Sequence, residues 1–512
     1  MSPLETILII DFGSQYTQLI ARRVRELGVY CEIHPPTALD RWEHPGRLMG
    51  TILSGGPASV DDAGAPFLDR KLLAAGLPVL GICYGFQLFT RWFGGTLGRS
   101  ARREYGRAQL VLQENHPLLS GWPAEAPVWM SHGDHVDALP PPFRVIARSG
   151  DVAFAAVAND DLKVYGVQFH PEVAHTPEGK KLLGNFLFPI CGCRGDWNMA
   201  SFAEAAALRI RAAAPHGKVL IGLSGGVDSA VTAELCHRSI GDRAVGVFVD
   251  TGLLRQDEAL EVLRTFEGEG LELRKVDAAD NFIRALSGVT DPEKKRKIIG
   301  RVFIDVFERA AADVGGAEYL AQGTLYPDVI ESVSFKGPSA TIKTHHNVGG
   351  LPEKLGFKLI EPLRELFKDE VRELGRTLGM PERILMRHPF PGPGLAVRIL
   401  GAITPERLDL LRRADRIFID MLHDEGLYSQ VWQAFAVLLP VQAVGVMGDQ
   451  RTYEAVLALR AVTSTDGMTA DFAHLPHDFL GRVAGRIINQ VKGVNRVTYD
   501  ISSKPPATIE WE

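Results

Sequence analysis

The sequence predicts an α/β protein with two open, mostly parallel sheet domains and a small C-terminal α+β domain. Short apolar runs alternate with helical patterns twice along the chain, as is typical of parallel sheets covered by helices. Two of these runs end in glycine-containing turns that lead directly into a helical pattern. The final stretch instead mixes helical patterns with a strand-like segment at 496–501.

The length of the chain, 512 residues, exceeds what a single hydrophobic core accommodates. The usual domain size predicts about three domains. We place them at 1–195, 196–386 and 387–512, because the glycine-rich stretch 191–198 and the turn-rich stretch 387–395 separate the periodic segments.

The charge balance argues against nucleic acid or a membrane surface as a partner. The formal net charge is −6, so no global basic field attracts phosphate. The basic run 293–297 is interpreted as a solvated helix face or loop. The apolar run 7–10 follows an acidic residue and is interpreted as a first strand, so it does not resemble a signal peptide.

Cysteine usage indicates a reducing compartment. Five cysteines in a chain of this length do not form a disulfide framework. Cys191 and Cys193 have no second pair with which to bind zinc, so free thiols are expected. We therefore expect a cytoplasmic protein.

The elements of the first domain follow from buried apolar runs. Strands are expected over 7–12, 51–53, 78–82 and 164–169, with helices between several of them. In an open parallel sheet the chemistry lies at the carboxyl ends of the strands.

The second domain repeats this pattern. A helix is expected to begin near Ser201, with that residue as its N-cap. A strand over 218–223, a helix over 230–239 and a strand over 244–249 follow.

A cysteine lies on a predicted strand-to-helix turn in the first domain. Cys83 is the centre of a G-x-C-x-G pattern directly after the strand that ends at 82. The flanking glycines permit a sharp turn, and the following helix N-terminus favours a thiolate. The pattern predicts a nucleophile at Cys83.

Two more strand ends supply what a thiolate nucleophile needs. His170 and Glu172 follow the strand that ends at 169, which predicts a Cys-His-Glu triad. The N–H groups of Gly56 and Tyr84 are the expected oxyanion donors. A lone cysteine or histidine is more often a core residue, but three motifs at three strand ends favour catalysis.

These motifs resemble the class I (triad) glutamine amidotransferases over most of 1–190. The resemblance implies glutamine as substrate, a thioester on Cys83 and ammonia as product. It also implies that Gln87, Ser131 and His132 help to hold glutamine. A metal site at His132 and His135 is rejected, because no third ligand stands at suitable spacing.

The second domain carries a phosphate-binding pattern, SGGVDS, between a strand and a helix. The loop consists of Ser224, Gly225, Gly226, Val227, Asp228 and Ser229. Its backbone N–H groups, hydroxyls and helix N-terminus suit phosphate oxygens. The loop lacks the Walker lysine, so a Walker ATPase or GTPase is disfavoured.

SGGVDS resembles the loop of the ATP-pyrophosphatase family, which cleaves ATP to AMP and pyrophosphate. The resemblance implies ATP as cosubstrate and a second nucleotide contact at Asp250. Mg²⁺ is expected because the charge of the leaving pyrophosphate must be neutralised. The candidate ligands are Asp228, Asp328, Glu331 and Asp369.

Longer stretches, including 322–332, 343–352, 361–372 and 504–512, resemble the glutamine-hydrolysing GMP synthetase family. The resemblance covers nearly the whole chain and implies amination of XMP through an adenylated intermediate. It implies a homodimer formed by the last domain. The dianionic phosphate of XMP needs donors in an acceptor pocket under a lid. The candidate acceptor and lid residues are Lys343, Lys368, Arg387, Pro391, Gly392, Gln433, Arg496, Lys504 and Glu510.

Two alternatives remain beside this interpretation. One is a glutamine-dependent adenylating ligase for a different carbonyl acceptor, such as UTP or deamido-NAD. The other is a catalytically silent nucleotide-binding module, which would require loss of the thiol, the histidine or the serine-aspartate loop. All of these are present in the sequence.

Overall fold

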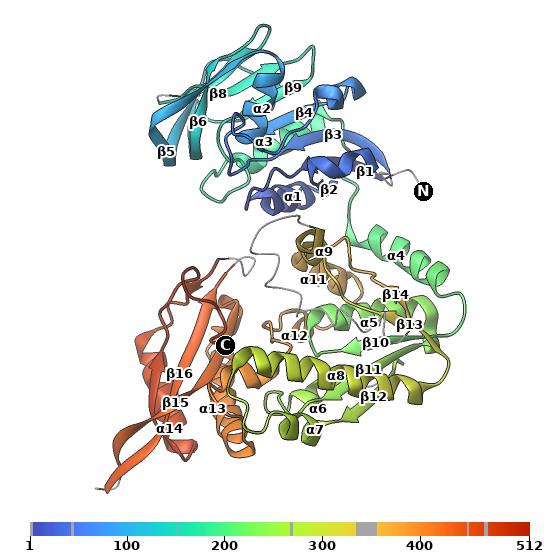
Figure 1. The fold of residues 1–512 in the computed structure, drawn as a ribbon, viewed down its shortest axis with the longest axis vertical. Coiled ribbons are helices and arrows are strands. Elements are labelled where there is room, and N and C mark those ends of the chain that lie inside the picture. Colours follow the sequence, from blue (N-terminus) through green and yellow to red (C-terminus); the bar gives the residue numbers. More distant parts are fainter. Residues whose placement is uncertain are drawn as a thin grey trace. The chain divides into compact units, whose positions relative to one another are not determined.

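The computed structural model describes residues 4–41, 46–150, 152–266, 270–333, 356–447, 450–464 and 469–512. The chain divides into two compact units, Met1–Ser201 and Phe202–Glu512 (Figure 1). The predicted division of the second unit at 386 stays a prediction. Among the described residues, no helix combines the length and apolar character needed to cross a membrane.

The first unit is built on one nine-stranded sheet with a parallel half and an antiparallel half. The parallel half contains the strands predicted from the apolar runs, and β1, β4 and β9 are buried along their whole length. In spatial order the strands are β2 (Tyr30–His34), β1 (Glu5–Ile10), β3 (Arg47–Leu53), β4 (Val79–Ile82), β9 (Val164–Val167), β8 (Val152–Asn159), β7 (Arg144–Ser149), β5 (Thr96–Leu112) and β6 (Glu125–Ala138).

Three helices cover this sheet. Helix α2 (Tyr84–Trp92) packs against β3, β4 and β9, while α1 (Thr17–Glu26) packs against β2 and α3 (Gly179–Asn185). Because β1, β2, β3, β4 and β9 are parallel, their carboxyl ends meet at one edge. That edge gathers the predicted triad.

The chain after Ile190 is irregular, as predicted, yet it is held against the first unit. The N–H of Trp197 donates to the carbonyl oxygen of Gly28 (2.9 Å). Its ring contacts Tyr30 (centroids 4.9 Å apart) and lies against the guanidinium of Arg25 (4.6 Å). A tryptophan therefore fixes the end of this segment to α1 and β2.

The second unit begins with a parallel five-stranded sheet. The strands are, in spatial order, β12 (Glu272–Asp277), β11 (Ala244–Asp250), β10 (Lys218–Leu223), β13 (Ala317–Ala321) and β14 (Lys358–Ile360). The helices of this part are α4 (Met199–Ala213), α5 (Val227–Ile240), α6 (Glu258–Phe266), α7 (Ala279–Ala285), α8 (Pro292–Val314), α9 (Tyr326–Val333), α11 (Lys368–Thr377) and α12 (Glu382–Leu385).

An antiparallel hairpin dominates the C-terminal part. It consists of β15 (Gln433–Met447) and β16 (Gln450–Thr463), and β16 also pairs with β17 (Asp471–Phe472) and β18 (Val494–Tyr499). Helices α13 (Pro405–Asp424) and α14 (His477–Gln490) pack on this sheet. One buried cluster contains Leu220 and Val245 of the parallel sheet together with Leu457, so the two parts share a core.

Two expectations differ from the structure. Helix α4 begins before Ser201, because the side chain of Asn198 accepts the N–H of Ser201 and caps the helix instead (3.0 Å). The basic run 293–297 is not wholly solvated. Lys295 is fully buried and donates to the carbonyl oxygens of Ala396 and Ile399 and to the carboxylate of Glu512.

Candidate active sites

Cys83 lies on a strained turn between β4 and α2. Its φ of +48° falls in the left-handed region that side chains other than glycine rarely adopt. The flanking glycines are required by close packing. A Cβ on Gly81 would lie 2.6 Å from the backbone nitrogen of Phe86, and one on Gly85 would lie 2.4 Å from the carbonyl oxygen of Leu53.

The predicted triad residues come together at this edge of the sheet. The Sγ of Cys83 lies 3.4 Å from the Nε2 of His170, and the Nδ1 of His170 lies 2.7 Å from a carboxylate oxygen of Glu172. All three side chains are buried. This geometry lets an imidazole take a proton from the thiol while the carboxylate orients the ring.

The surroundings of His170 favour its protonated form. Burial opposes the charge, but the charges of Cys83 and Glu172 outweigh it, so the pKa of His170 is raised well above its usual value. A hydrogen bond holds the backbone of His170 in place. Its carbonyl oxygen accepts the hydroxyl of Thr176 (2.7 Å). The ring of Tyr16 meets the imidazole edge-on at 5.1 Å.

The two predicted oxyanion donors lie on neighbouring backbone segments. The carbonyl oxygen of Ser54 accepts the N–H of Gly85 (3.0 Å), which ties the turn after β3 to the start of α2. A Cβ on Gly56 would lie 3.1 Å from the ring of Tyr84. Within the described part of the chain, the N–H groups of Gly56 and Tyr84 make no hydrogen bond. They are available to an oxyanion.

The residues expected to hold glutamine lie on α2 and β6. The side-chain amide of Gln87 donates to the carbonyl oxygen of Asp134 (2.8 Å), so the two elements are joined. Ser131 and His132 lie on the same strand. Burial, together with the charges of His135 and His170, lowers the pKa of His132 to about 4, so its ring is neutral at physiological pH.

The phosphate loop connects β10 to α5 as predicted. The hydroxyl of Ser229 accepts the N–H of Ser224 (3.2 Å), and the two hydroxyl oxygens are 3.1 Å apart. Gly225 has a φ of +78°, and a Cβ there would lie 2.8 Å from a methyl carbon of Val262. The loop therefore brings hydroxyls, backbone N–H groups and a helix N-terminus together, a combination that suits an anion.

The three predicted metal ligands whose side chains the structure describes, Asp228, Asp328 and Asp369, do not form one cluster. Asp328 accepts the N–H of Leu325 at the start of α9 (3.0 Å), Asp369 stands in the first turn of α11, and the side chain of Glu331 lies outside the described residues. No group of three or more His, Cys, Asp or Glu side chains that could hold a metal occurs within the described ranges.

Among the described residues, Asp228 has a carboxylate oxygen that suits a cation. One of its oxygens pairs with Lys368 Nζ, whereas the other, Oδ1, is buried without a hydrogen-bond partner among the described residues. A single carboxylate suits Mg²⁺, which usually takes most of its ligands from nucleotide phosphates and water.

Asp250 ends the neighbouring strand β11, beside the loop. Its carboxylate accepts the N–H of Gly252 (3.2 Å) and lies 3.4 Å from the Nζ of Lys275. Arg412 of α13 donates to the carbonyl oxygen of Gly252. The turn after β11 is thereby tied to the C-terminal part.

Two predicted acceptor residues meet in a buried polar cluster. The amide nitrogen of Gln433 donates to a carboxylate oxygen of Glu510 (2.9 Å) and to the carbonyl oxygen of Pro389 (2.9 Å). Glu510 also receives two hydrogen bonds from Arg398, at 2.8 and 3.1 Å. Arg398 is fully buried and was missed by the sequence analysis, although an arginine inside the apolar run 395–400 is the signal that could have found it.

The remaining predicted acceptor residues are dispersed. Pro391 and Gly392 lie in the turn before Gly394. The backbone of Lys504 exchanges hydrogen bonds with Ala470. Arg387 contacts the phosphate loop. Lys343 lies outside the described residues.

Arg496 lies at a distance from Gln433. It stands opposite Val456 on β16, whereas Gln433 stands opposite Val462. Six strand residues separate these positions, a distance of roughly 20 Å.

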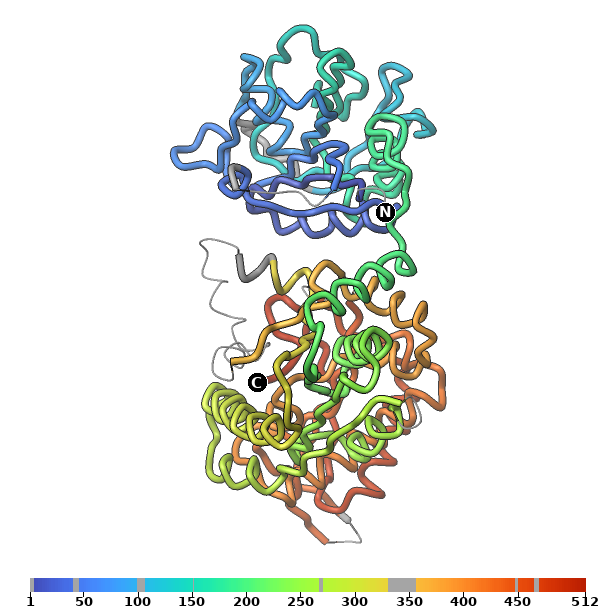
Figure 2. The backbone as a smooth tube through the Cα atoms, turned by 90° about the vertical axis from the view of Figure 1, so that its right-hand side faces the viewer, coloured from blue at the N-terminus to red at the C-terminus, as the bar shows by residue number. Residues whose placement is uncertain are grey.

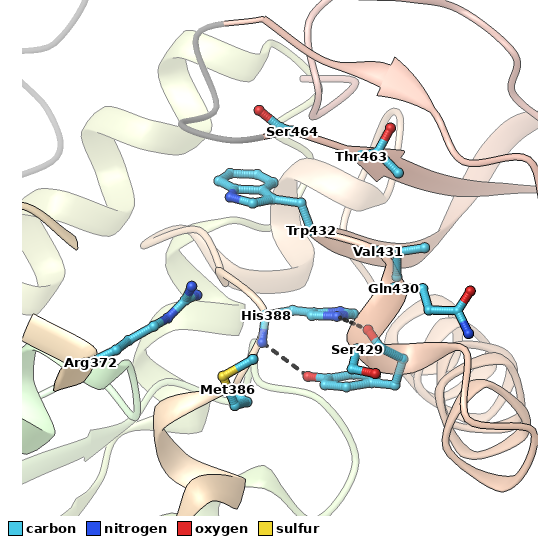
Figure 3. Close-up of a pocket in the computed structure, with 10 residues that line it drawn as sticks. Arg372, Met386, His388, Ser429, Gln430, Val431, Trp432, Thr463 and Ser464 are labelled. Atoms are coloured by element: carbon cyan, nitrogen blue, oxygen red, sulfur yellow. Dashed lines mark hydrogen bonds between the residues drawn. The ribbon is translucent and has the colours of Figure 1, made fainter. Parts of the chain in front are cut away.

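A cavity of about 190 Å³ lies beside the start of the C-terminal part (Figure 3). His388 stacks on Tyr428 (centroids 3.6 Å apart), and its backbone N–H donates to the Tyr428 hydroxyl. Burial is the main cause that lowers the pKa of His388 to about 4. Arg372 and Trp432 line the same cavity. No pattern in the sequence indicates this pairing, because 40 residues separate the two rings.

Three family models match successive stretches of the chain. The model for class-I glutamine amidotransferases matches residues 8–190, that for NAD synthase matches 209–299, and that for the GMP synthase C-terminal domain matches 420–511. The triad, the phosphate loop and the Gln433–Glu510 pair each lie inside one of these stretches.

Curated relatives match the chain over nearly its whole length with high sequence identity. The chain is 58% identical over 515 residues to the GMP synthase (glutamine-hydrolyzing) of Chlorobaculum tepidum, with 99% of each chain covered. It is 58% identical over 507 residues to the protein of the same description from Aquifex aeolicus, again with 99% of each covered. For one from Rhodopseudomonas palustris the identity is 59% over 513 residues, covering 99% of this chain and 95% of the relative.

Proposed function

Because the chain belongs to the family of glutamine-hydrolysing GMP synthases, we propose that it converts XMP to GMP with ammonia taken from glutamine. The overall reaction consumes XMP, ATP, glutamine and water, and yields GMP, AMP, pyrophosphate and glutamate. The observation that carries the proposal is a buried Cys-His-Glu triad and an SGGVDS loop in one chain.

At the first site, we propose that Cys83 is the nucleophile. Its thiolate attacks the side-chain amide carbon of glutamine, and the oxyanion is held by the N–H groups of Gly56 and Tyr84. His170 then gives a proton to the nitrogen, the carbon–nitrogen bond breaks, and ammonia leaves a thioester. His170 next takes a proton from water, which attacks the thioester and releases glutamate and the thiol. Glu172 orients His170 throughout.

At the second site, the phosphate loop binds the β- and γ-phosphates of ATP. The carbonyl oxygen at C2 of XMP attacks the α-phosphorus, and the bond to pyrophosphate breaks. Ammonia then adds to C2 and AMP leaves with the former carbonyl oxygen. The hydroxyls of Ser224 and Ser229 and the loop N–H groups orient the phosphates. Asp228 would hold Mg²⁺, which neutralises phosphate charge when bound.

For the acceptor, we propose that Gln433 and Glu510 contact XMP. The pair already shares a hydrogen bond (2.9 Å), and Arg398 fixes the carboxylate from the other side. A preorganised amide and carboxylate match the donors and acceptors of a purine ring.

The decisive measurement is pyrophosphate release with ATP, Mg²⁺ and ammonium, comparing XMP with IMP, UTP and deamido-NAD. We expect release that depends on XMP, with GMP as the product. Release with another of these acceptors instead would retain both sites and contradict the assigned substrate.

We also propose a homodimer formed by the β15–β16 hairpin, which projects from the second unit in both views (Figures 1 and 2). Four large apolar side chains along it are at least half exposed, namely Val441, Val444, Val446 and Tyr453. A second copy of the chain would cover them. A cytoplasmic location accords with the five buried, unpaired cysteines.

A further inference from the structure

Arg387 was predicted to face the acceptor, but its side chain reaches the phosphate loop. One guanidinium nitrogen, Nη1, donates to the carbonyl oxygen of Gly225 at 2.7 Å. The contact is close enough that a Cβ on Gly225 would lie 3.2 Å from this nitrogen. The residue that opens the C-terminal part therefore bonds directly to the loop that grips ATP.

The guanidinium is held in place by a buried carboxylate. The second nitrogen, Nη2, lies 2.8 Å from an oxygen of Glu258, whose side chain is 4% exposed. The other oxygen of Glu258 accepts the N–H of Arg255 (2.9 Å). Glu258 therefore has both oxygens occupied, which fixes the direction in which Arg387 presents its donors.

The direction of the Gly225 carbonyl matters for phosphate binding. A carbonyl oxygen that turned toward the β,γ-phosphates would repel them, whereas N–H groups attract them. Gly225 has the conformational freedom to make this turn, because glycine populates positive and negative φ about equally. A donor at 2.7 Å holds the carbonyl in one direction.

We propose that Arg387, oriented by Glu258, is a positioning residue for the ATP phosphate loop and not a ligand of the acceptor. The inference rests on the proposed function, because it concerns how the loop serves ATP cleavage. The positive charge of Arg387 contributes less to phosphate binding than its hydrogen bond to the loop does. Glu258 and Glu261 lie 2.8 and 3.9 Å from the same guanidinium nitrogen and offset its charge.

The same contacts connect the loop to the strand that carries Gln433. Arg255 donates to the carbonyl oxygen of Ala434 (2.8 Å) and lies 3.3 Å from Asp415. The next residue after Arg387, His388, is clamped by two hydrogen bonds and ring stacking on Tyr428 (Figure 3). Arg387 therefore projects from a fixed backbone, as a positioning residue must.

The test compares Arg387→Gln with wild type in the ammonium-supported reaction, which needs no glutamine. We expect KM for ATP and the inhibition constant for inorganic pyrophosphate each to rise about tenfold, with KM for XMP changed less than about threefold. Arg387→Lys can keep one of the two contacts. Its KM for ATP is therefore expected to lie between the values of wild type and Arg387→Gln. Arg383→Gln removes an equal charge from an exposed site four residues earlier and is the matched control.

The outcomes separate three cases. A raised KM for XMP with an unchanged KM for ATP would overturn the inference and make Arg387 an acceptor ligand. A lower kcat with both KM values unchanged would also overturn it, since ATP binding would then not depend on Arg387. Absence of XMP-dependent pyrophosphate release in the wild type would contradict the proposed function itself. In the double variant, Glu258→Gln should raise KM for ATP little beyond the effect of Arg387→Gln alone, because the two residues act through one contact.

Discussion

The Nζ of Lys368 and a carboxylate oxygen of Asp228 form an ion pair 2.5 Å long at the phosphate loop. The two residues come from the first turns of different helices, α11 and α5. Asp228 was predicted as a loop residue and metal ligand, and Lys368 as an acceptor or lid residue. If the loop binds Mg²⁺–ATP as proposed, Asp228 is expected to exchange Lys368 for the cation, and Lys368 to exchange Asp228 for a phosphate.

Replacement of Asp228 by Asn is expected to raise the Mg²⁺ concentration needed for half-maximal pyrophosphate release. The amide keeps the shape but loses the charge that suits a divalent cation, so we expect a rise of about tenfold or more. Titration of Mg²⁺ with ammonium as the nitrogen donor measures this. The exposed Asp242, changed to Asn, is the control. An unchanged Mg²⁺ requirement would remove Asp228 from the proposed metal ligands.

Replacement of Cys83 by Ala should abolish glutamine use and leave the ammonium-supported reaction. The proposed thioester cannot form without the thiol, whereas the second site has its own residues. Glutamate release and GMP formation from ammonium are measured on the same preparation. Loss of both activities in a folded variant would contradict the chemical independence of the sites.

Replacement of Glu172 by Gln should move the basic limb of the pH profile to lower pH. In the wild type the pKa of His170 is raised, so its imidazolium persists above pH about 6.5 and is lost as the pH rises through the raised value. Without the carboxylate charge, the pair with Cys83 should titrate at lower pH. Glutamate release between pH 5 and 9 measures the shift, with Glu178→Gln as control. An unmoved limb would exclude this role for Glu172.

Replacement of Glu512 by Gln should destabilise the second unit. Lys295 has a side chain that is 0% exposed, and Glu512 is its only carboxylate partner among the described residues. Breaking a buried pair from one side costs about 3 kcal/mol. Thermal and denaturant unfolding measure the loss. Glu293→Gln, which removes a carboxylate that is 64% exposed, should cost less than about 1 kcal/mol. Equal losses of unfolding free energy in the two variants would argue that the buried pair stabilises the unit no more than the exposed pair does.

Replacement of Val446 or Tyr453 by Glu should shift the protein toward a monomer. Both side chains are more than 60% exposed on the hairpin, and a charge there opposes burial in a dimer. Sedimentation over a range of protein concentrations measures the change. A wild type that is monomeric at all concentrations would refute the proposed homodimer.

Local pattern was enough to predict the strand ends that carry the chemistry. The strand over 218–223 was predicted with the boundaries it has, and the strand before Cys83 to within one residue. Buried parallel strands have unbroken apolar runs, and their glycine turns are visible at short range. The antiparallel half of the first sheet, β5 to β8, was not predicted. Exposed and buried positions mix along β6 and β7, so these strands lack the unbroken apolar run that marks a buried parallel strand.

Contacts over long range could not be read in this way. Arg387 was predicted to serve the acceptor because its stretch resembles the GMP synthetase family, and nothing in the sequence indicated its contacts with Gly225 and Glu258. Lys295 was interpreted as solvated because it stands in a basic run, but helix α8 turns this one residue toward the core. Sequence spacing shows which residues lie on the same face of a helix or strand. It does not show which other segment of the chain packs against that face.

The packing of Trp197 determines where the first unit can be separated as an independent protein. A fragment that stopped at 195 would remove the indole from Tyr30 and Arg25 and expose both to water. One that extended to 201 would retain this cover and the hydrogen bond to Gly28. Expression of the glutaminase as a soluble fragment is therefore expected to depend on six residues that contain no catalytic group.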